Sequence, residues 1–192
     1  GDGIILIDAG SEFKGYAADI TRSWPTSGRF TEEQRAIYQL VLFAQKAAIE
    51  QCRVGNPFNA PHEAARNVLA EGLISLGISD QSLEESLTKD GDLGKWYMHN
   101  TGHWIGLDVH DVGIYRPNGE PRLFEEGMVI TVEPGLYFGA WRDDVDVPPR
   151  YADIGIRIED DVLITANDPD VLSKDCPKEI DELEAIIGSN YY

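Results

Sequence analysis

The spacing of apolar and polar positions divides this chain into three parts, and the first part predicts strands. Residues 3–10 (GIILIDAG) form a short continuous apolar run between glycines, which predicts a buried strand. Residues 13–24 predict a second strand, interrupted at Pro25. Ser11 and Glu12 separate the two runs and predict the turn of a hairpin. The first part therefore predicts two antiparallel strands.

The second part has the spacing of helices. Thr31 and Gln34 are placed as in a capping box, and apolar residues then recur every three or four positions up to an expected end near Val54–Gly55. Another helix is expected to begin with Pro61 at an early position and to stop at Gly77. Both predicted helices carry an apolar face that can pack on a sheet.

The third part returns to strand-length pieces rich in Gly, Val, Ile and aromatic residues. The strongest strand predictions are 128–132 and 154–158, while 82–88 predicts a short helix and 177–187 a terminal one. The order of strands, helices, strands and helix predicts an α+β fold, with helices packed on one side of a mostly antiparallel sheet. A length of 192 residues suits one domain.

The composition of the chain argues against several classes of binding partner. The chain has 16 Lys and Arg against 34 Asp and Glu, a net charge of −18, which argues against nucleic acid and against anionic membranes. No apolar run approaches the ~20 residues of a membrane-spanning helix, and no signal peptide is visible. Cys52 and Cys176 lie far apart, which argues against a disulfide framework and favours a reducing, cytoplasmic location.

Two aspartates lie in otherwise apolar or small segments. Asp8 follows four apolar residues, and Asp19 lies on the predicted returning strand of the hairpin. A buried carboxylate is costly unless its charge is compensated, and two close carboxylates raise each other's pKa. A cation between them would remove the conflict. The alternative is that Asp8 is a turn residue and that Asp19 pairs with Arg22.

Histidines cluster in one segment, HNTGHWIGLDVHDVG. His99, His103 and His110 are three of the four histidines in the chain, and imidazole is both the commonest metal ligand and the usual acid–base group near neutral pH. Ordinary hydrogen-bonded histidines in a loop are the alternative. The fourth, His62, stands alone on a predicted helix and is assigned no role.

Two glutamates end predicted strands. Glu133 follows VITV and precedes Pro134, and Glu159 shares a strand face with Arg157. A strand-end surface charge and a same-face ion pair are the respective alternatives. Four carboxylates and one imidazole would form a set of hard ligands suited to two divalent ions such as Mn²⁺, Co²⁺ or Zn²⁺. No calcium loop, phosphate loop, GxGxxG or nucleophile elbow occurs.

Four blocks together carry a family resemblance: LIDAGSEFKGYAADITRSWP, HNTGHWIGLDVHDVG, GMVITVEPGLYF and GIRIEDDVLIT. The chain resembles aminopeptidase P, in the proline-specific branch of the pita-bread metallopeptidases, over nearly all of its length. The resemblance implies the pita-bread form of the α+β fold. It also implies that residues 1–192 are an N-terminally truncated catalytic domain, without the family's N-terminal domain and the first part of the catalytic domain.

The resemblance assigns roles to nine residues. Asp8 would chelate one ion, Asp19 and Glu159 would bridge two ions, and His103 and Glu133 would complete the second. His99 and His110 would face the substrate, while Tyr137 and Arg157 would support the site.

The implied reaction is hydrolysis of an N-terminal Xaa-Pro bond by hydroxide held between two divalent ions, with Mn²⁺ favoured and Zn²⁺ or Co²⁺ as alternatives. Glu133 would serve as the base. The expected partners are peptides with proline in the second position, and the full-length protein is expected to be a homo-oligomer. The segment 146–151 favours aminopeptidase P over prolidase, which stays an alternative, as does a truncated and inert metal-binding fragment.

Overall fold

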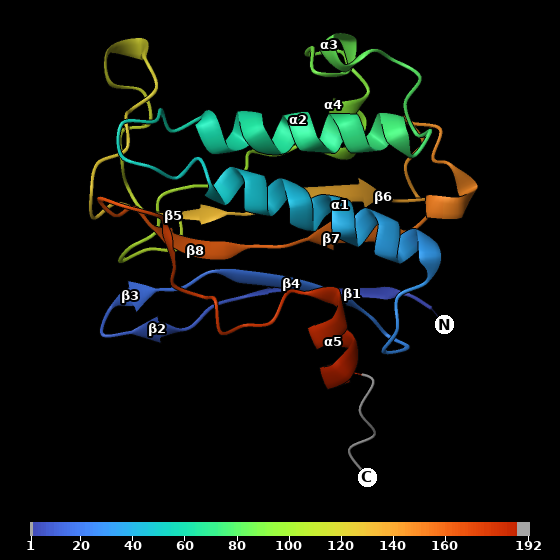
Figure 1. The fold of residues 1–192 in the computed structure, drawn as a ribbon, viewed down its shortest axis with the longest axis horizontal. Helices are drawn as coiled ribbons and strands as arrows, with labels where there is room; N and C mark the ends of the chain where they lie inside the picture. The colour runs from blue at the N-terminus through green and yellow to red at the C-terminus, as the bar shows by residue number, and fades with distance from the viewer. Residues whose placement is uncertain (1, 188–192) are drawn as a thin grey trace.

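Two long helices, running in opposite directions, lie over antiparallel strands in the computed structural model, which describes residues 2–187 (Figure 1). The strands are β1 (Ile4–Ala9), β2 (Glu12–Phe13), β3 (Tyr16–Ala17), β4 (Ile20–Pro25), β5 (Val129–Val132), β6 (Gly135–Phe138), β7 (Ile154–Arg157), β8 (Asp160–Leu163) and β9 (Asp170–Val171). The helices are α1 (Glu32–Ile49), α2 (Ala60–Ser75), α3 (Leu83–Ser86), α4 (Leu93–Trp96) and α5 (Ile180–Ile187), with short 3₁₀ turns at Pro117–Gly119 and Pro149–Tyr151.

The predicted hairpin exists, but its turn lies further along the chain than expected. β1 pairs with β4 and β2 pairs with β3, both antiparallel and in one continuous register. Lys14 and Gly15 form the turn, and their φ angles of 55° and 84° are the pair of positive values that a tight hairpin requires. The predicted turn at Ser11–Glu12 is wrong, and the strand expected over 13–24 is divided among β2, β3 and β4.

The capping box of α1 is confirmed. The Gln34 backbone N–H donates to Thr31 Oγ1, and the Thr31 backbone N–H donates to Gln34 Oε1. The helix ends at Ile49, before the expected end near Val54, because tight turns follow it: the N–H of Cys52 already donates to the carbonyl of Ile49. Helix α2 begins where Pro61 predicts and ends just before Gly77.

The core lies between the two helices and the strands beneath them. Ile37 and Val41 of α1 are fully buried, as are Leu69 and Leu73 of α2 and Ile156 of β7. The strand pairs within residues 2–187 are antiparallel, with β5 beside β8 and β6 beside β7. The predicted α+β arrangement is therefore confirmed.

The β1–β4 hairpin is attached to the later strands by specific hydrogen bonds. Ser23 Oγ donates to the carbonyl of Arg157 at 2.9 Å, and the Glu159 N–H donates to the carbonyl of Thr21 at 3.1 Å. These contacts bring residues near the start of the chain beside residues that follow more than 130 positions later. No helix within residues 2–187 is long and apolar enough to cross a membrane.

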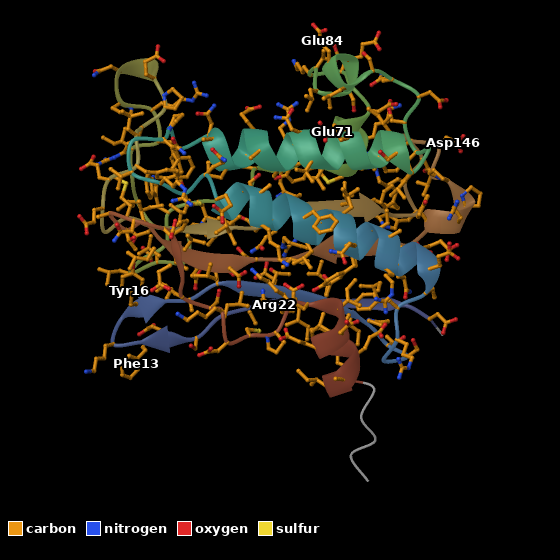
Figure 2. All side chains as sticks on the ribbon, in the orientation of Figure 1. Phe13, Tyr16, Arg22, Glu71, Glu84 and Asp146 are labelled. Atoms are coloured by element: carbon orange, nitrogen blue, oxygen red, sulfur yellow. The ribbon has the colours of Figure 1, made fainter. Side chains whose placement is uncertain are left out.

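A buried ion network fixes the last part of the described chain. Arg22 donates to Asp160 at 2.7 Å and Lys178 donates to the same carboxylate at 2.5 Å, while Ser173 Oγ donates to it at 2.6 Å. Burial alone would raise the pKa of Asp160, but Arg22 and Lys178 outweigh it and bring the pKa down to about 2. Figure 2 shows Arg22 between β4 and the segment that leads into α5.

Candidate metal centre

Three predicted ligands meet at one point. One ligand atom from each of Asp19, His103 and Glu159 lies within 4.8 Å of the others. Asp19 immediately precedes β4, His103 lies in a loop beside β5, and Glu159 stands between β7 and β8. Both carboxylates are buried, at 7% and 1% exposure. The fold therefore gathers hard oxygen and imidazole donors from three separate segments.

The other two predicted ligands flank this group. Glu133 Oε1 lies 3.7 Å from His103 Nε2, on the side of the imidazole where Asp19 Oδ2 is 3.4 Å away. Asp8 hydrogen-bonds the Asp19 carboxyl group across the hairpin. All five residues thus form one continuous cluster, although Asp8 is half-exposed and stands at its edge.

The carboxyl groups of the cluster have raised pKa values, as expected where acidic groups lie close together. Burial first, and then the nearby Glu133, raise the pKa of Glu159 to about 8. Burial likewise raises the pKa of Glu133 to about 7, against the lowering effect of Arg157. The pKa of Asp19 is also raised, by burial and then by Asp8. Carboxylates held so close together repel one another when ionised, and divalent cations would relieve this repulsion.

Arg157 connects the cluster to its supporting residues. Its guanidinium donates to Asp8 Oδ2 at 2.5 Å, to Tyr137 Oη at 3.1 Å and to Thr21 Oγ1 at 3.2 Å. Tyr137 Oη is also 2.7 Å from His99 Nε2. The strands β4 and β7 therefore fix one end of this chain of hydrogen bonds, and the histidine segment fixes the other.

The remaining predicted histidines border the same space. His99 Nδ1 lies 4.0 Å from Glu133 Oε2, and the ring of His110 lies 4.3 Å from the ring of His103. Burial lowers the pKa of His99, so its imidazole is biased toward the neutral form. His110 is exposed. The structure thus brings all nine predicted residues into one region.

Two of the structural alternatives are wrong. Arg22 pairs with Asp160, not with Asp19, and Arg157 pairs with Asp8, not with Glu159. The carboxylates of Asp19 and Glu159 therefore have no arginine that neutralises them directly within residues 2–187.

Sequence reasoning missed several residues around the cluster. Thr21 Oγ1 donates to Glu159 Oε2 at 2.5 Å, and it could have been found because it lies two positions after Asp19 and so shares its strand face. Asp161 accepts the Asp19 backbone N–H at 3.1 Å. His62 Nδ1 lies 2.8 Å from Thr101 Oγ1, and nothing in the sequence placed this helical histidine near the histidine segment.

The donor chemistry fits divalent ions. Four carboxylates and one imidazole offer hard oxygen donors and a single nitrogen, the type of set that suits Mn²⁺ and related ions rather than a thiolate zinc site. A cleft of about 720 Å³ opens beside the cluster, and Glu133, His99, His103, His110 and Arg157 line it. A substrate can therefore reach the candidate metal centre.

Comparison with known proteins decides the family. The model of metallopeptidase family M24 matches residues 1–166. The chain belongs to metallopeptidase family M24. Family M24 thus matches the β1–β4 hairpin, the histidine segment and Glu159 together, which are the parts that build the cluster.

Named relatives within M24 agree with this assignment. The chain is 45% identical to an Xaa-Pro aminopeptidase of Haemophilus influenzae over 185 residues, which are 96% of this chain and 42% of the relative. An Xaa-Pro aminopeptidase of Escherichia coli is 41% identical over 184 residues, 96% of this chain and 41% of the relative. The chain thus spans about two fifths of the length of these relatives.

Solved structures show the same fold. The Pseudomonas aeruginosa aminopeptidase PepP superposes with a TM-score of 0.92 at 46% identity, covering 97% of this chain and 42% of the other. A substrate complex of an Escherichia coli aminopeptidase P variant, with one glutamate replaced by alanine, gives a TM-score of 0.89 at 41% identity over 97% of this chain and 42% of the other. The expected pita-bread fold and the resemblance to aminopeptidase P are confirmed.

The raised carboxyl pKa values predict how metal affects stability. In the metal-free folded protein the pKa is about 7 for Glu133 and about 8 for Glu159, whereas both groups have a pKa of 4.5 when unfolded. Between these values the folded state binds more protons than the unfolded state, so folding stability falls as the pH rises from about 4.5 to about 8. Bound cations require the ionised carboxylates and should stabilise most at the upper end. We expect the rise in Tm on adding Mn²⁺ to be larger at about pH 8 than at about pH 5.5, measured by scanning calorimetry. Equal rises at both pH values would contradict the prediction.

Proposed function

We propose that the protein hydrolyses the bond between an N-terminal residue and a following proline, using divalent ions held by Asp8, Asp19, His103, Glu133 and Glu159. The observation that carries this proposal is the meeting of these five residues in one cluster, with Asp8 at its half-exposed edge. The names of the M24 relatives, which are Xaa-Pro aminopeptidases at 41–45% identity, support the reaction type.

Two ions fit the proposal better than one. Asp19 and Glu159 would contribute to holding both ions, Asp8 would complete the ligands of one, and His103 with Glu133 would complete those of the other. We favour Mn²⁺, with Zn²⁺ and Co²⁺ as the other ions that such oxygen-rich sets accept. When bound, such ions lower the pKa of water toward neutrality and polarise a carbonyl group.

Glu133 is the proposed proton carrier. Its carboxylate lies 3.7 Å from His103 within the proposed ligand set, where an ionised side chain could act as a general base beside a bound ion. It would accept a proton from the attacking water and deliver it to the proline nitrogen as that nitrogen leaves. Its carboxylate borders the cleft, where a peptide would have to lie for this transfer.

The surrounding side chains would orient the peptide. His110 borders the cleft beside His103, where its N–H group could donate to the oxygen of the scissile carbonyl. His99 would line the substrate side beside Glu133, because its Nδ1 already contacts the Asn100 carbonyl and its Nε2 the Tyr137 hydroxyl. Tyr137 and Arg157 hold His99 and Asp8 in place through the hydrogen bonds at 2.7 and 2.5 Å. The acidic cluster would attract the free amino group of the substrate.

The proposal also covers the longer protein to which this chain would belong. Because the chain spans about two fifths of its relatives, we propose that residues 1–192 form part of the catalytic domain of a longer, homo-oligomeric protein. The relatives' names favour an Xaa-Pro aminopeptidase over a prolidase. Free Cys52 and Cys176 are consistent with the proposed cytoplasmic location.

A chelation experiment tests the proposal. The full-length protein should cleave the first residue from an Xaa-Pro peptide, lose that activity on removal of metal and regain it with Mn²⁺. A matched peptide with alanine in place of proline should be cleaved far more slowly. Product release is measured by chromatography. Activity that persists after complete metal removal, or equal cleavage of both peptides, would refute the proposal.

A further inference from the structure

The cleft extends well beyond the metal centre. Besides the site residues, its walls include Phe58, Pro61 and Tyr115, and its far part also includes Arg116 and Pro121. These residues belong to the start of α2 and to the segment before β5, which lie side by side at one end of the molecule (Figure 1). Nothing in the proposed hydrolysis requires this far part, so its chemistry calls for an explanation.

The far part of the cleft forms an apolar trough, lined by Phe58, Pro61 and Tyr115 and held in place by contacts between side chains. The ring of Phe58 contacts those of Trp104 and Tyr115 at 4.7 and 4.9 Å. Tyr115 Oη accepts the backbone N–H of Trp104, and the carbonyl of Tyr115 accepts the N–H of Arg122 at 2.8 Å. The Phe58 N–H donates to the carbonyl of Arg122, which attaches the two walls to each other. Arg116 therefore follows an anchored residue.

The charge of Arg116 is unusual in its setting. Within residues 2–187 it forms no ion pair, although the chain carries a net charge of −18. The other arginine of the cleft, Arg157, is paired with Asp8, and Glu63 is engaged by Arg66 at 3.6 Å. Among the cleft arginines in the described part of the chain, Arg116 is thus the one without an ion pair, and it is exposed and available to an anionic ligand.

The direction of a bound peptide follows from charge. Its amino group belongs at the carboxylate cluster, and the residues after the proline must then continue along the cleft. We propose that these residues lie in the trough of Phe58, Pro61 and Tyr115, and that Arg116 binds the C-terminal carboxylate of a short peptide. This inference rests on the proposed function and deepens it, because it defines the substrate class as short peptides with a free carboxylate.

A second cavity is an alternative place for the C-terminal part of the peptide. It has about 440 Å³, is lined by Arg66 and Lys89, and shares His62, His99 and Asn100 with the first. Lys89 forms no ion pair within the described part of the chain. Arg116 is favoured because its own cleft also holds Glu133 and the apolar trough, whereas the second cavity does not reach Glu133. Lys89→Gln is therefore the matched control for Arg116→Gln.

Binding of product-like peptides tests the inference without relying on turnover. The probes are Pro-Leu, Pro-Leu-Leu and Pro-Leu-Leu-Leu, each as free acid and as amide, titrated calorimetrically into the Mn²⁺-loaded full-length protein. At one of these lengths the acid should bind more tightly than the amide. Arg116→Gln should weaken that acid about fivefold, the scale of an exposed ion pair, and leave the amide unchanged. Lys89→Gln should change neither.

Several results would overturn the inference. They are an absence of acid preference at every length, an equal effect of Arg116→Gln on acid and amide, a loss of acid binding in Lys89→Gln alone, or no binding of any probe. None of these depends on whether Xaa-Pro peptides are cleaved. A protein that binds the acids through Arg116 but cleaves no Xaa-Pro peptide would refute only the proposed function.

Discussion

Replacing Glu133 by glutamine is expected to lower kcat on an Xaa-Pro peptide by about a hundredfold or more, the usual scale of general acid–base catalysis. Glutamine keeps the shape of the side chain beside His103 but cannot accept a proton. The full-length protein is assayed with saturating Mn²⁺, and bound metal is measured by mass spectrometry, so that a loss of proton transfer can be separated from a loss of the ion.

The control for this substitution is Glu125→Gln. Glu125 is an exposed glutamate that pairs with Arg122 at 3.0 Å and does not line the cleft. Its replacement should leave kcat within a factor of two, on the order expected for an exposed pair. If Glu133→Gln retains its metal and turns over as fast as the Glu125→Gln variant, Glu133 is not the proton carrier.

Asp160→Ala is expected to lower the free energy of unfolding by about 3–5 kcal/mol, because it leaves Arg22 buried without its partner. Arg22 has a side-chain exposure of 6% and Asp160 of 0%, so solvent cannot replace the lost carboxylate. Lys178, Ser173 and Gln45 each lose an acceptor as well. Urea unfolding, followed by circular dichroism on the metal-free protein, measures the change.

Asp168→Ala provides the comparison. Asp168 also pairs with an arginine, Arg53, at 2.8 Å, but its side chain is 87% exposed. Water and salt screen this pair, so its loss should produce no measurable change in the urea midpoint. If the two aspartate variants unfolded at the same urea concentration, the Asp160 network would not be a major source of stability.

Local signals in the sequence predicted the helices well and the hairpin turn poorly. The capping box of Thr31 and Gln34 and the early Pro61 fix helix starts through contacts within a few residues, so they can be read directly. The turn at Lys14 and Gly15 depends on two positive φ angles, and only Gly15 is a residue type that favours such an angle. The end of α1 at Ile49 is followed by tight turns over residues 48–53, and no Gly or Pro in this segment marks them.

The sequence predicted which residue types form the candidate site, but it did not predict which of them contact one another in space. Carboxylates after apolar runs, as at Asp8 and Glu133, are conspicuous because burial of an unpaired charge is costly. The spacing of Thr21 to Asp19 places it on the strand face of that ligand, but its contact with Glu159 spans 138 positions, so the spacing does not identify this partner. The two alternatives, that Arg22 pairs with Asp19 and Arg157 with Glu159, were wrong for the same reason, because the ion pairs that form join distant segments.

The separation between Thr21 and Glu159 has a consequence for synthesis. The aspartates of the hairpin emerge from the ribosome long before Glu159, and closing so long a loop is entropically slow. During this interval Asp8 and Asp19 remain solvated and hold an ion only weakly, because their three proposed fellow ligands, His103, Glu133 and Glu159, are not yet folded beside them. The ions would therefore bind tightly only after the chain has been synthesised beyond Glu159. A nascent polypeptide that stops before β7 would gain no stability from metal in its surroundings.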